Sequence, residues 1–237
     1  MENTGKTKDQ LVEELKKVRK KIAELEKIKV KSNKIEEELS WNYKKLSDVM
    51  EEIASIFTKV VEMRDPYLRG HHQGVSRLAT AIAQEMKISR DRIESIRFAA
   101  LVHDVGRINW PTKIVNNDSK LVEAEYDFIK SHSKIGYYIL RSVDFPWLIA
   151  EIAYQHHERL DGSGYPRGLK DDEILVEAKI IGVADVVEAM SSHRPYRSAY
   201  SIREALDEIS NNRGILYETE VVDTCLTLFK EKNFKFK

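Results

Sequence analysis

Apolar side chains recur at alternating intervals of four and three residues through the first quarter of the chain. This spacing puts them on one stripe of a helix, with lysine and glutamate over the rest of its surface. The stripe slips at Ile28 and includes the polar Ser32 and Asn42. Its apolar members are Leu11, Leu15, Val18, Ile22, Leu25, Ile35, Leu39, Leu46, Val49, Ile53, Ile56 and Val60. The pattern predicts a helix over about residues 8–63 with the seam of a coiled coil.

A straight helix of this length would extend on the order of 80 Å, which is too long to fold back onto a small domain. We therefore expect a parallel homodimer through residues 11–60, with a coiled-coil and linker segment at 1–62 and a globular domain at 63–237. The alternative is a solvated single helix or a frayed tail, because isolated polar helices are marginal in water.

The pattern after residue 63 is that of a globular helical domain. Apolar stripes with helical spacing cover residues 75–83, 93–102, 124–140, 147–154, 180–190, 202–209 and 221–226. Ser89 and Gly106 flank the second of these stripes as start and stop signals. Residues 161–168 form a glycine-dense loop that no regular element would accept. Charged residues make up 33% of the chain and glycine and proline are scarce, so the sequence predicts an all-α fold.

Composition narrows the range of partners and compartments. Lysine plus arginine and aspartate plus glutamate both total 39, so no overall basic field would bind a nucleic acid polymer. The amino-terminal segment is polar, and no stretch approaches the roughly 20 apolar residues of a membrane span. With Cys225 as the single cysteine, a disulfide within the chain is excluded. A reducing, cytoplasmic location is the expectation.

All seven histidines lie between His71 and His193. His103 and Asp104 interrupt an apolar helix, where burial of both is costly unless each is paired or bound to a metal. His156 and His157 interrupt a second apolar run, and Asp185 a third. Imidazoles and carboxylates without a thiolate favour iron, manganese or similar divalent ions over a structural zinc.

The same residues resemble the HD-GYP group of the HD superfamily of metal-dependent phosphohydrolases. The matching motifs are HDVGR at 103–107, HHERLDGSGYP at 156–166 and VADVVEAMSSHRPYR at 183–197, and the resemblance begins at RDPYLRGHH, residues 64–72. It implies an HD-domain helical bundle that holds two divalent ions, with His103 and Asp104 as the catalytic pair and Asp104 bridging the ions. The implied metal ligands are His71, His103, Asp104, His132, His156, His157 and Asp185.

The resemblance also implies a reaction. Family members hydrolyse cyclic di-GMP to linear pGpG or GMP, by attack of a hydroxide that bridges the two ions. The positions that contact phosphate correspond to Arg107, Arg194 and Arg197. Tyr67 stands where some members have a carboxylate for a third ion, which favours two. Such domains commonly follow a sensor or receiver domain, so a signalling partner is expected.

Some positions depart from the family pattern, and alternatives stay open. Gly74 stands where arginine is common, Glu188 where aspartate is frequent, and Leu175 where proline is frequent. We expect His72 and His193 to be exposed or to lie behind the ligands. The alternatives are a weakly active or inactive module that binds a cyclic dinucleotide or a protein, and a phosphodiesterase for another cyclic dinucleotide such as cyclic GMP-AMP.

Overall fold

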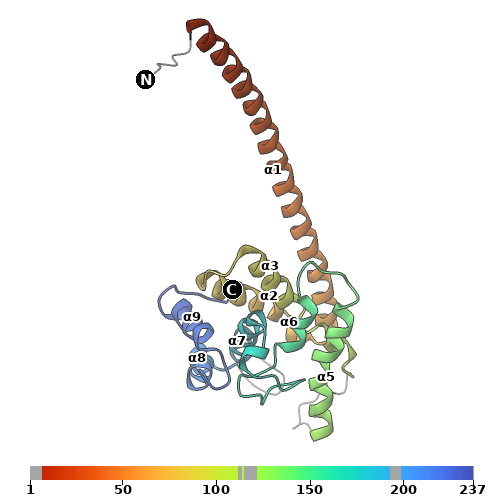
Figure 1. Ribbon diagram of the computed structural model, residues 1–237. Helices are drawn as coiled ribbons and strands as arrows, with labels where there is room; N and C mark the ends of the chain where they lie inside the picture. The colour runs from red at the N-terminus through yellow and green to blue at the C-terminus, as the bar shows by residue number, and fades with distance from the viewer. Residues whose placement is uncertain (1–6, 112–113, 115–121, 193–198, 237) are drawn as a thin grey trace. The chain divides into compact units, whose positions relative to one another are not determined.

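The computed structural model describes residues 7–111, 114, 122–192 and 199–236 (Figure 1). These residues form helices without a sheet, which confirms the all-α prediction. Two isolated bridges join residue 161 to 170 and residue 213 to 217. The α-helices are α1 (Lys8–Arg64), α2 (His71–Glu85), α3 (Arg90–Val102), α5 (Glu123–Leu140), α6 (Ile149–Gln155), α7 (Val176–Ser191), α8 (Ile202–Asn211) and α9 (Thr219–Lys230). Short 3-10 turns are η1 (Pro66–Leu68), η2 (Val105–Asn109) and η3 (Asp171–Glu173).

The chain divides into two compact units, Met1–Met50 and Glu51–Lys237. Through the first unit, α1 is a single helix with its seam residues exposed, including Leu15, Ile22 and Leu25. The predicted helix over residues 8–63 is confirmed in its extent, whereas its pairing with a second helix stays a prediction. Within the described part of the chain, every helix is too short or too polar to span a lipid bilayer.

The last turns of α1 belong to the second unit. Ala54, Thr58 and Val61 are buried there. The Thr58 hydroxyl lies 3.0 Å from the Ala54 carbonyl oxygen and 2.9 Å from that of Leu101, so it ties α1 to the end of α3. The globular part of the chain therefore takes in residues that precede the expected boundary at 62/63.

Two helices, α2 and α7, form the centre of the second unit. Helix α2 packs against α3, α7 and α9, and α7 also packs against α6 and α8. The buried faces of these two helices are apolar except for a few polar side chains that are buried with them, namely His71, His72, Ser76, Asp185 and Glu188. Helix α5 packs against η2 and α6. Figure 1 shows α2, α3, α6 and α7 gathered in one bundle, and the rings of His71 at the start of α2, His103 after α3 and His156 after α6 lie next to one another.

The end of α3 differs from its predicted position. Ser89 precedes the helix as expected, but the helix ends at Val102 rather than at Gly106. His103 and Asp104 lie in the bend that follows, and η2 begins at Val105. A Cβ on Gly106 would collide with the His132 carbonyl of α5. Gly106 therefore allows two backbones to approach closely and does not end the helix.

Candidate metal centre

Seven histidine and aspartate side chains that could hold metal ions converge in two adjoining groups, in each of which one possible ligand atom per residue lies within 4.8 Å of all the others. The Asp104 group contains Asp104, His132, His156 and His157. The Asp185 group contains His71, His103 and Asp185. Together the groups contain every residue that the sequence proposes as a metal ligand.

The Asp104 group draws its residues from three segments. Asp104 follows α3, His132 lies within α5, and His156 and His157 follow α6. His132 Nε2 lies 3.2 Å from Asp104 Oδ1 and 3.5 Å from His156 Nε2. The rings of His156 and His157 are 3.9 Å apart between centroids. These ring nitrogens and one carboxylate oxygen therefore point into a common space.

The Asp185 group joins the first residue of α2 to the middle of α7. His71 Nε2 lies 3.2 Å from Asp185 Oδ1, and His103 Nε2 lies 3.9 Å from the same oxygen. All three residues are buried. Within the described part of the chain, His103 Nε2 has no hydrogen-bond partner, although it is buried. Burying such a nitrogen without a partner costs free energy unless a ligand binds it.

Asp104 lies between the two groups. While Oδ1 faces His132, Oδ2 lies 3.6 Å from His103 Nε2 and 3.9 Å from His71 Nε2. One carboxylate thus offers an oxygen to each group, which is the arrangement expected of a bridging ligand.

Backbone carbonyls orient three of the histidines in the same way. The Nδ1 atoms of His103, His132 and His156 lie 2.8, 2.7 and 2.6 Å from the carbonyl oxygen three residues earlier in the chain. Because a carbonyl can only accept, each Nδ1 carries the hydrogen. A neutral ring then presents the Nε2 lone pair to the centre.

The protonation of these rings suits a cation. Burial lowers the pKa of His156 to about 3, and burial also lowers the pKa of His132 and His157. The Nε2 atoms of His132 and His156 therefore face each other as two lone pairs only 3.5 Å apart. Two lone pairs repel at this distance unless a cation lies between them, so the residues present fit a divalent ion.

The acidic groups and His71 complete the charge distribution. Burial opposes ionisation of both aspartates. The charge of Arg107 nevertheless holds the pKa of Asp104 well below its usual range. The hydrogen bond from His71 does the same for Asp185. Burial likewise lowers the pKa of His71, but hydrogen bonds to Asp185 and Glu188 outweigh it and raise that pKa to about 9. In the metal-free protein at neutral pH, both ring nitrogens of His71 are therefore protonated and the ring is positively charged.

Close backbone approaches position the ligands. Besides Gly106 against His132, a Cβ on Gly182 in α7 would lie 2.8 Å from the His156 carbonyl oxygen. A larger residue at position 106 would push η2 away from α5, and one at position 182 would push α7 away from the end of α6. The glycines therefore set the spacing between segments that carry ligands.

The glycine-dense loop lies beside the Asp104 group. The buried Glu158 carboxylate accepts hydrogen bonds from the amides of Arg167 and Leu169, at 2.8 and 2.9 Å. Gly162 has a positive φ. Tyr165 packs its ring against that of His157, with the two ring centroids 4.6 Å apart. The predicted tight loop is thus confirmed, and Glu158 organises it.

The three arginines proposed to contact phosphate differ in what the structure shows. Arg107 Nη1 donates to Asp104 at 2.9 Å, Nη2 donates to Asp65 at 2.7 Å, and the guanidinium lies 4.0 Å from the Trp110 ring centroid. It therefore holds the Asp104 carboxylate directly. Arg194 and Arg197, together with His193, lie outside the described residues.

Three further buried residues lie beside the site, and sequence reasoning did not predict their partners. His72 is fully buried between the rings of His71 and His103, and burial keeps its pKa well below the usual value, so of the two expectations the position behind the ligands is correct. Asp65 is buried and holds Arg107. Glu188 contacts His71. Asp65 lies in the RDPYLRGHH segment that resembles the family, but its pairing with Arg107 could not be predicted from the sequence.

Known proteins are similar to this chain in sequence or in fold. A cyclic di-GMP phosphodiesterase of Thermotoga maritima is 42% identical over 186 residues, covering 78% of this chain and 50% of that protein. A 3'3'-cGAMP-specific phosphodiesterase of Vibrio cholerae is 39% identical over 164 residues, covering 69% and 35%. The crystal structure of a cyclic GMP-AMP specific phosphodiesterase of V. cholerae matches with a TM-score of 0.60 at 18% identity, covering 79% and 49%. At that identity the likeness shows the fold alone.

The chain spans half or less of the length of these relatives. The family model described as the HD domain matches residues 55–221, which include both groups of ligands. The HDVGR and HHERLDGSGYP motifs that suggested the HD-GYP group contain four of the seven converging side chains. The chain belongs to the HD domain family, and its resemblance to the HD-GYP group is confirmed.

Proposed function

We propose that this protein is a metal-dependent phosphodiesterase that hydrolyses a cyclic dinucleotide, with cyclic di-GMP as its substrate. The observation that carries the proposal is the convergence of seven ligands in two groups that share Asp104. Two groups call for two divalent ions. The neutral imidazoles and buried carboxylates favour iron or manganese.

Ions bound there would lower the pKa of water and polarise a phosphoryl oxygen, which are the two requirements of phosphodiester hydrolysis at neutral pH. The side chains of this protein would hold the ions and orient the groups around them. Asp104 offers one oxygen to each group, and Arg107 fixes its carboxylate from the side. His103 holds its Nε2 towards both aspartates through its bond to the Ala100 carbonyl.

The names of the relatives support the substrate class. The T. maritima relative is named for cyclic di-GMP and the V. cholerae relative for 3'3'-cGAMP, so cyclic GMP-AMP is the alternative substrate. A weakly active or inactive binding module is the less favoured alternative, because all seven proposed ligand residues are present and converge. Incubating the whole chain with Mn²⁺ or Fe²⁺ and each dinucleotide, and separating the products as pGpG and GMP, distinguishes these possibilities.

We expect Arg194 and Arg197 to bind the substrate phosphates. Replacing either by alanine should leave metal content unchanged and weaken cyclic di-GMP binding by roughly 1.5 to 3 kcal/mol, the scale of one charge-assisted hydrogen bond. Calorimetric titration of a catalytically inactive variant measures this. Unchanged affinity in both variants would mean that these arginines do not hold the substrate.

Arg107 should behave differently from those two residues. Since its guanidinium joins Asp104 to Asp65, Arg107→Ala should weaken both substrate and metal binding. Arg107→Lys keeps the charge but cannot bridge two carboxylates with a planar fork, so we expect an intermediate effect. Mn²⁺ and dinucleotide titrations of the two variants check this order.

Metal binding should release a proton from His71. Below its pKa of about 9, this residue carries a proton that the ion must displace, so raising the pH favours binding. Mn²⁺ affinity should rise by up to about tenfold per pH unit between pH 6 and 8 and level off above the pKa. Titration in buffers of different ionisation enthalpy counts the released protons, and an affinity independent of pH would contradict this assignment.

We further propose that the seam of α1 within residues 1–62 pairs as a parallel coiled coil in a homodimer, that residues 63–237 together with the last turns of α1 form the catalytic domain, and that a sensor or other signalling protein acts on it. The exposed seam of α1 supports the dimer. A cytoplasmic location, where cyclic dinucleotides act as signals, accords with the single buried cysteine.

A further inference from the structure

We propose that Glu188 is a positioning residue that fixes His71 as a metal ligand, and that Gly74 provides the space it needs. The inference rests on the proposed metal-dependent function. Both positions depart from the residues frequent in the family, and the structure places them in contact.

His71 differs from the other oriented histidines in where it lies. His103, His132 and His156 each have a helical turn before them, whose carbonyl accepts from Nδ1. His71 is the first residue of α2 and follows Gly70, which has a left-handed conformation. No preceding helical turn presents a carbonyl to its Nδ1, so another acceptor is required.

Glu188 supplies that acceptor. Its Oε2 contacts His71 Nδ1 in a short hydrogen bond, while Asp185 Oδ1 lies 3.2 Å from Nε2 of the same ring. Asp185 and Glu188 are three residues apart on α7, so one turn of this helix meets both nitrogens of His71. The second oxygen of Glu188 accepts from the Ser192 hydroxyl at 2.7 Å. The buried carboxylate is thus held from both sides.

Gly74 lies one turn after His71 on α2, facing the Glu188 side chain. A Cβ at this position would lie 2.8 Å from Glu188 Cγ and 3.2 Å from its Oε1. Such contacts are too close, so a side chain at residue 74 would displace the carboxylate from His71. The two departures from the family pattern are therefore one coupled feature, because the glutamate needs the space that the glycine leaves.

The expected consequence concerns metal affinity. A carboxylate that accepts from the far nitrogen of a ligating histidine fixes the tautomer and makes the other nitrogen more basic. Removing such a partner costs about 10- to 100-fold in metal affinity. Glu188 contacts His71 and no other ligand named above, so the loss should fall on the Asp185 group and spare the Asp104 group.

Mn²⁺ titration of the metal-free whole chain tests this inference. Glu188→Ala should weaken one of two binding events by about 10- to 100-fold and change the other little. Glu188→Gln keeps the size and the contacts with Ser192 and Gly74 but removes the charge. It should lose affinity at the same event by an intermediate factor. Wild-type Mn²⁺ binding in Glu188→Gln would leave only a packing role and overturn the proposal.

A double-mutant cycle tests the role of Gly74. Gly74→Ala alone should weaken the same Mn²⁺ event, because it displaces Glu188. In a Glu188→Ala background, Gly74→Ala should cause no further loss, since its target is gone. Additive losses would mean that Gly74 acts independently of Glu188 and would contradict the coupling.

Val187→Ala is the matched control for packing on the same helix. Val187 is fully buried, so its truncation should lower the melting temperature of the metal-free protein without selectively weakening either Mn²⁺ event. A selective loss in this variant equal to that of Glu188→Ala would also overturn the proposal. Because the readout is Mn²⁺ binding, a wild-type protein that binds two ions yet hydrolyses no cyclic dinucleotide would contradict the proposed function and leave this inference standing.

Discussion

Replacing Asp104 by asparagine or alanine is expected to abolish hydrolysis and to reduce Mn²⁺ binding at both groups of ligands. Asp104 offers Oδ1 to one group and Oδ2 to the other, so its loss affects both ions together. The Lewis-acid contribution is worth several kcal/mol, so kcat/KM should fall by at least about a thousandfold. Metal analysis of the purified variants and product separation after incubation with cyclic di-GMP measure the two effects.

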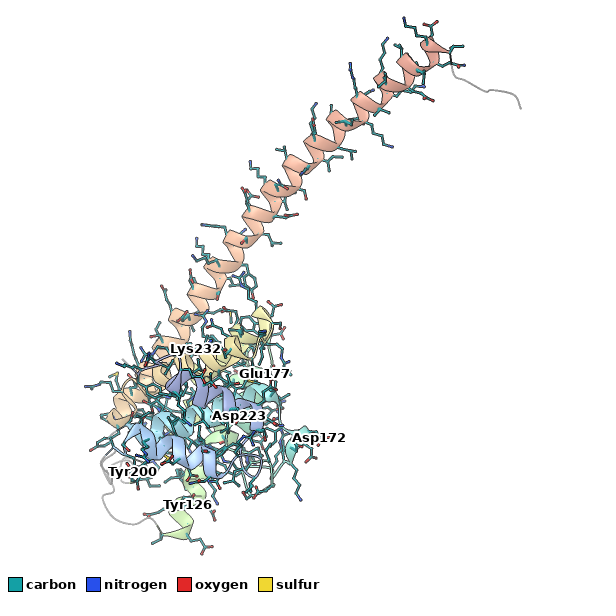
Figure 2. The ribbon with its side chains drawn as sticks, turned by 90° about the vertical axis from the view of Figure 1, so that its left-hand side faces the viewer. Tyr126, Asp172, Glu177, Tyr200, Asp223 and Lys232 are labelled. Atoms are coloured by element: carbon teal, nitrogen blue, oxygen red, sulfur yellow. The ribbon has the colours of Figure 1, made fainter. Side chains whose placement is uncertain are left out.

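The asparagine variant controls for folding because it keeps the size of the side chain and can still accept from Arg107. Asp223→Ala is the matched control for loss of a carboxylate. Asp223 lies exposed on α9 (Figure 2) and forms an ion pair with Arg213, so its removal should change stability by no more than about 1 kcal/mol. An Asp104→Asn protein that retains two ions and wild-type turnover would contradict the shared-ligand account.

Replacing Ile22 by glutamate is expected to convert a dimer of the whole chain into monomers. Ile22 belongs to the apolar seam of α1, and in a parallel dimer it would pack against its own copy. Two glutamates at the seam would repel and lose apolar burial, at a cost of several kcal/mol that raises the dissociation constant at least about a hundredfold. Light scattering over a range of protein concentrations measures the change.

Val30→Glu is the matched control because Val30 is exposed on the same helix but lies off the seam. This variant should remain dimeric. A shortened chain that tests the same interface should begin at Glu51, so that it keeps the buried contact of Thr58 with Leu101. A wild-type chain that is monomeric at micromolar concentration would contradict the dimer.

The parts of the fold that could be predicted are those with a strong local pattern. The long helix follows from sustained four-three spacing, and the all-α class from charge content and helical stripes. The metal ligands could be proposed because His103, Asp104 and Asp185 interrupt apolar runs, and because the motifs around them resemble a known family. Neither kind of signal requires knowledge of how helices pack.

The parts that could not be predicted depend on contacts between residues distant in the chain. Gly106 appears in the sequence as a stop signal, but its need for a small side chain arises from the His132 carbonyl of α5. Likewise, Gly74 and Glu188 look like two unrelated departures until α2 and α7 are packed together. Such roles depend on tertiary packing, which local patterns along the chain do not reveal.

The central claim, metal-dependent hydrolysis of a cyclic dinucleotide, is tested most directly by one incubation. Whole-chain protein, stripped of metal and then supplied with Mn²⁺ or, anaerobically, Fe²⁺, is mixed with cyclic di-GMP, and the products are separated by chromatography. The account predicts conversion to pGpG or GMP that depends on added metal and is absent in Asp104→Asn. Intact cyclic di-GMP and intact cyclic GMP-AMP after prolonged incubation, with two ions bound per chain, would contradict it.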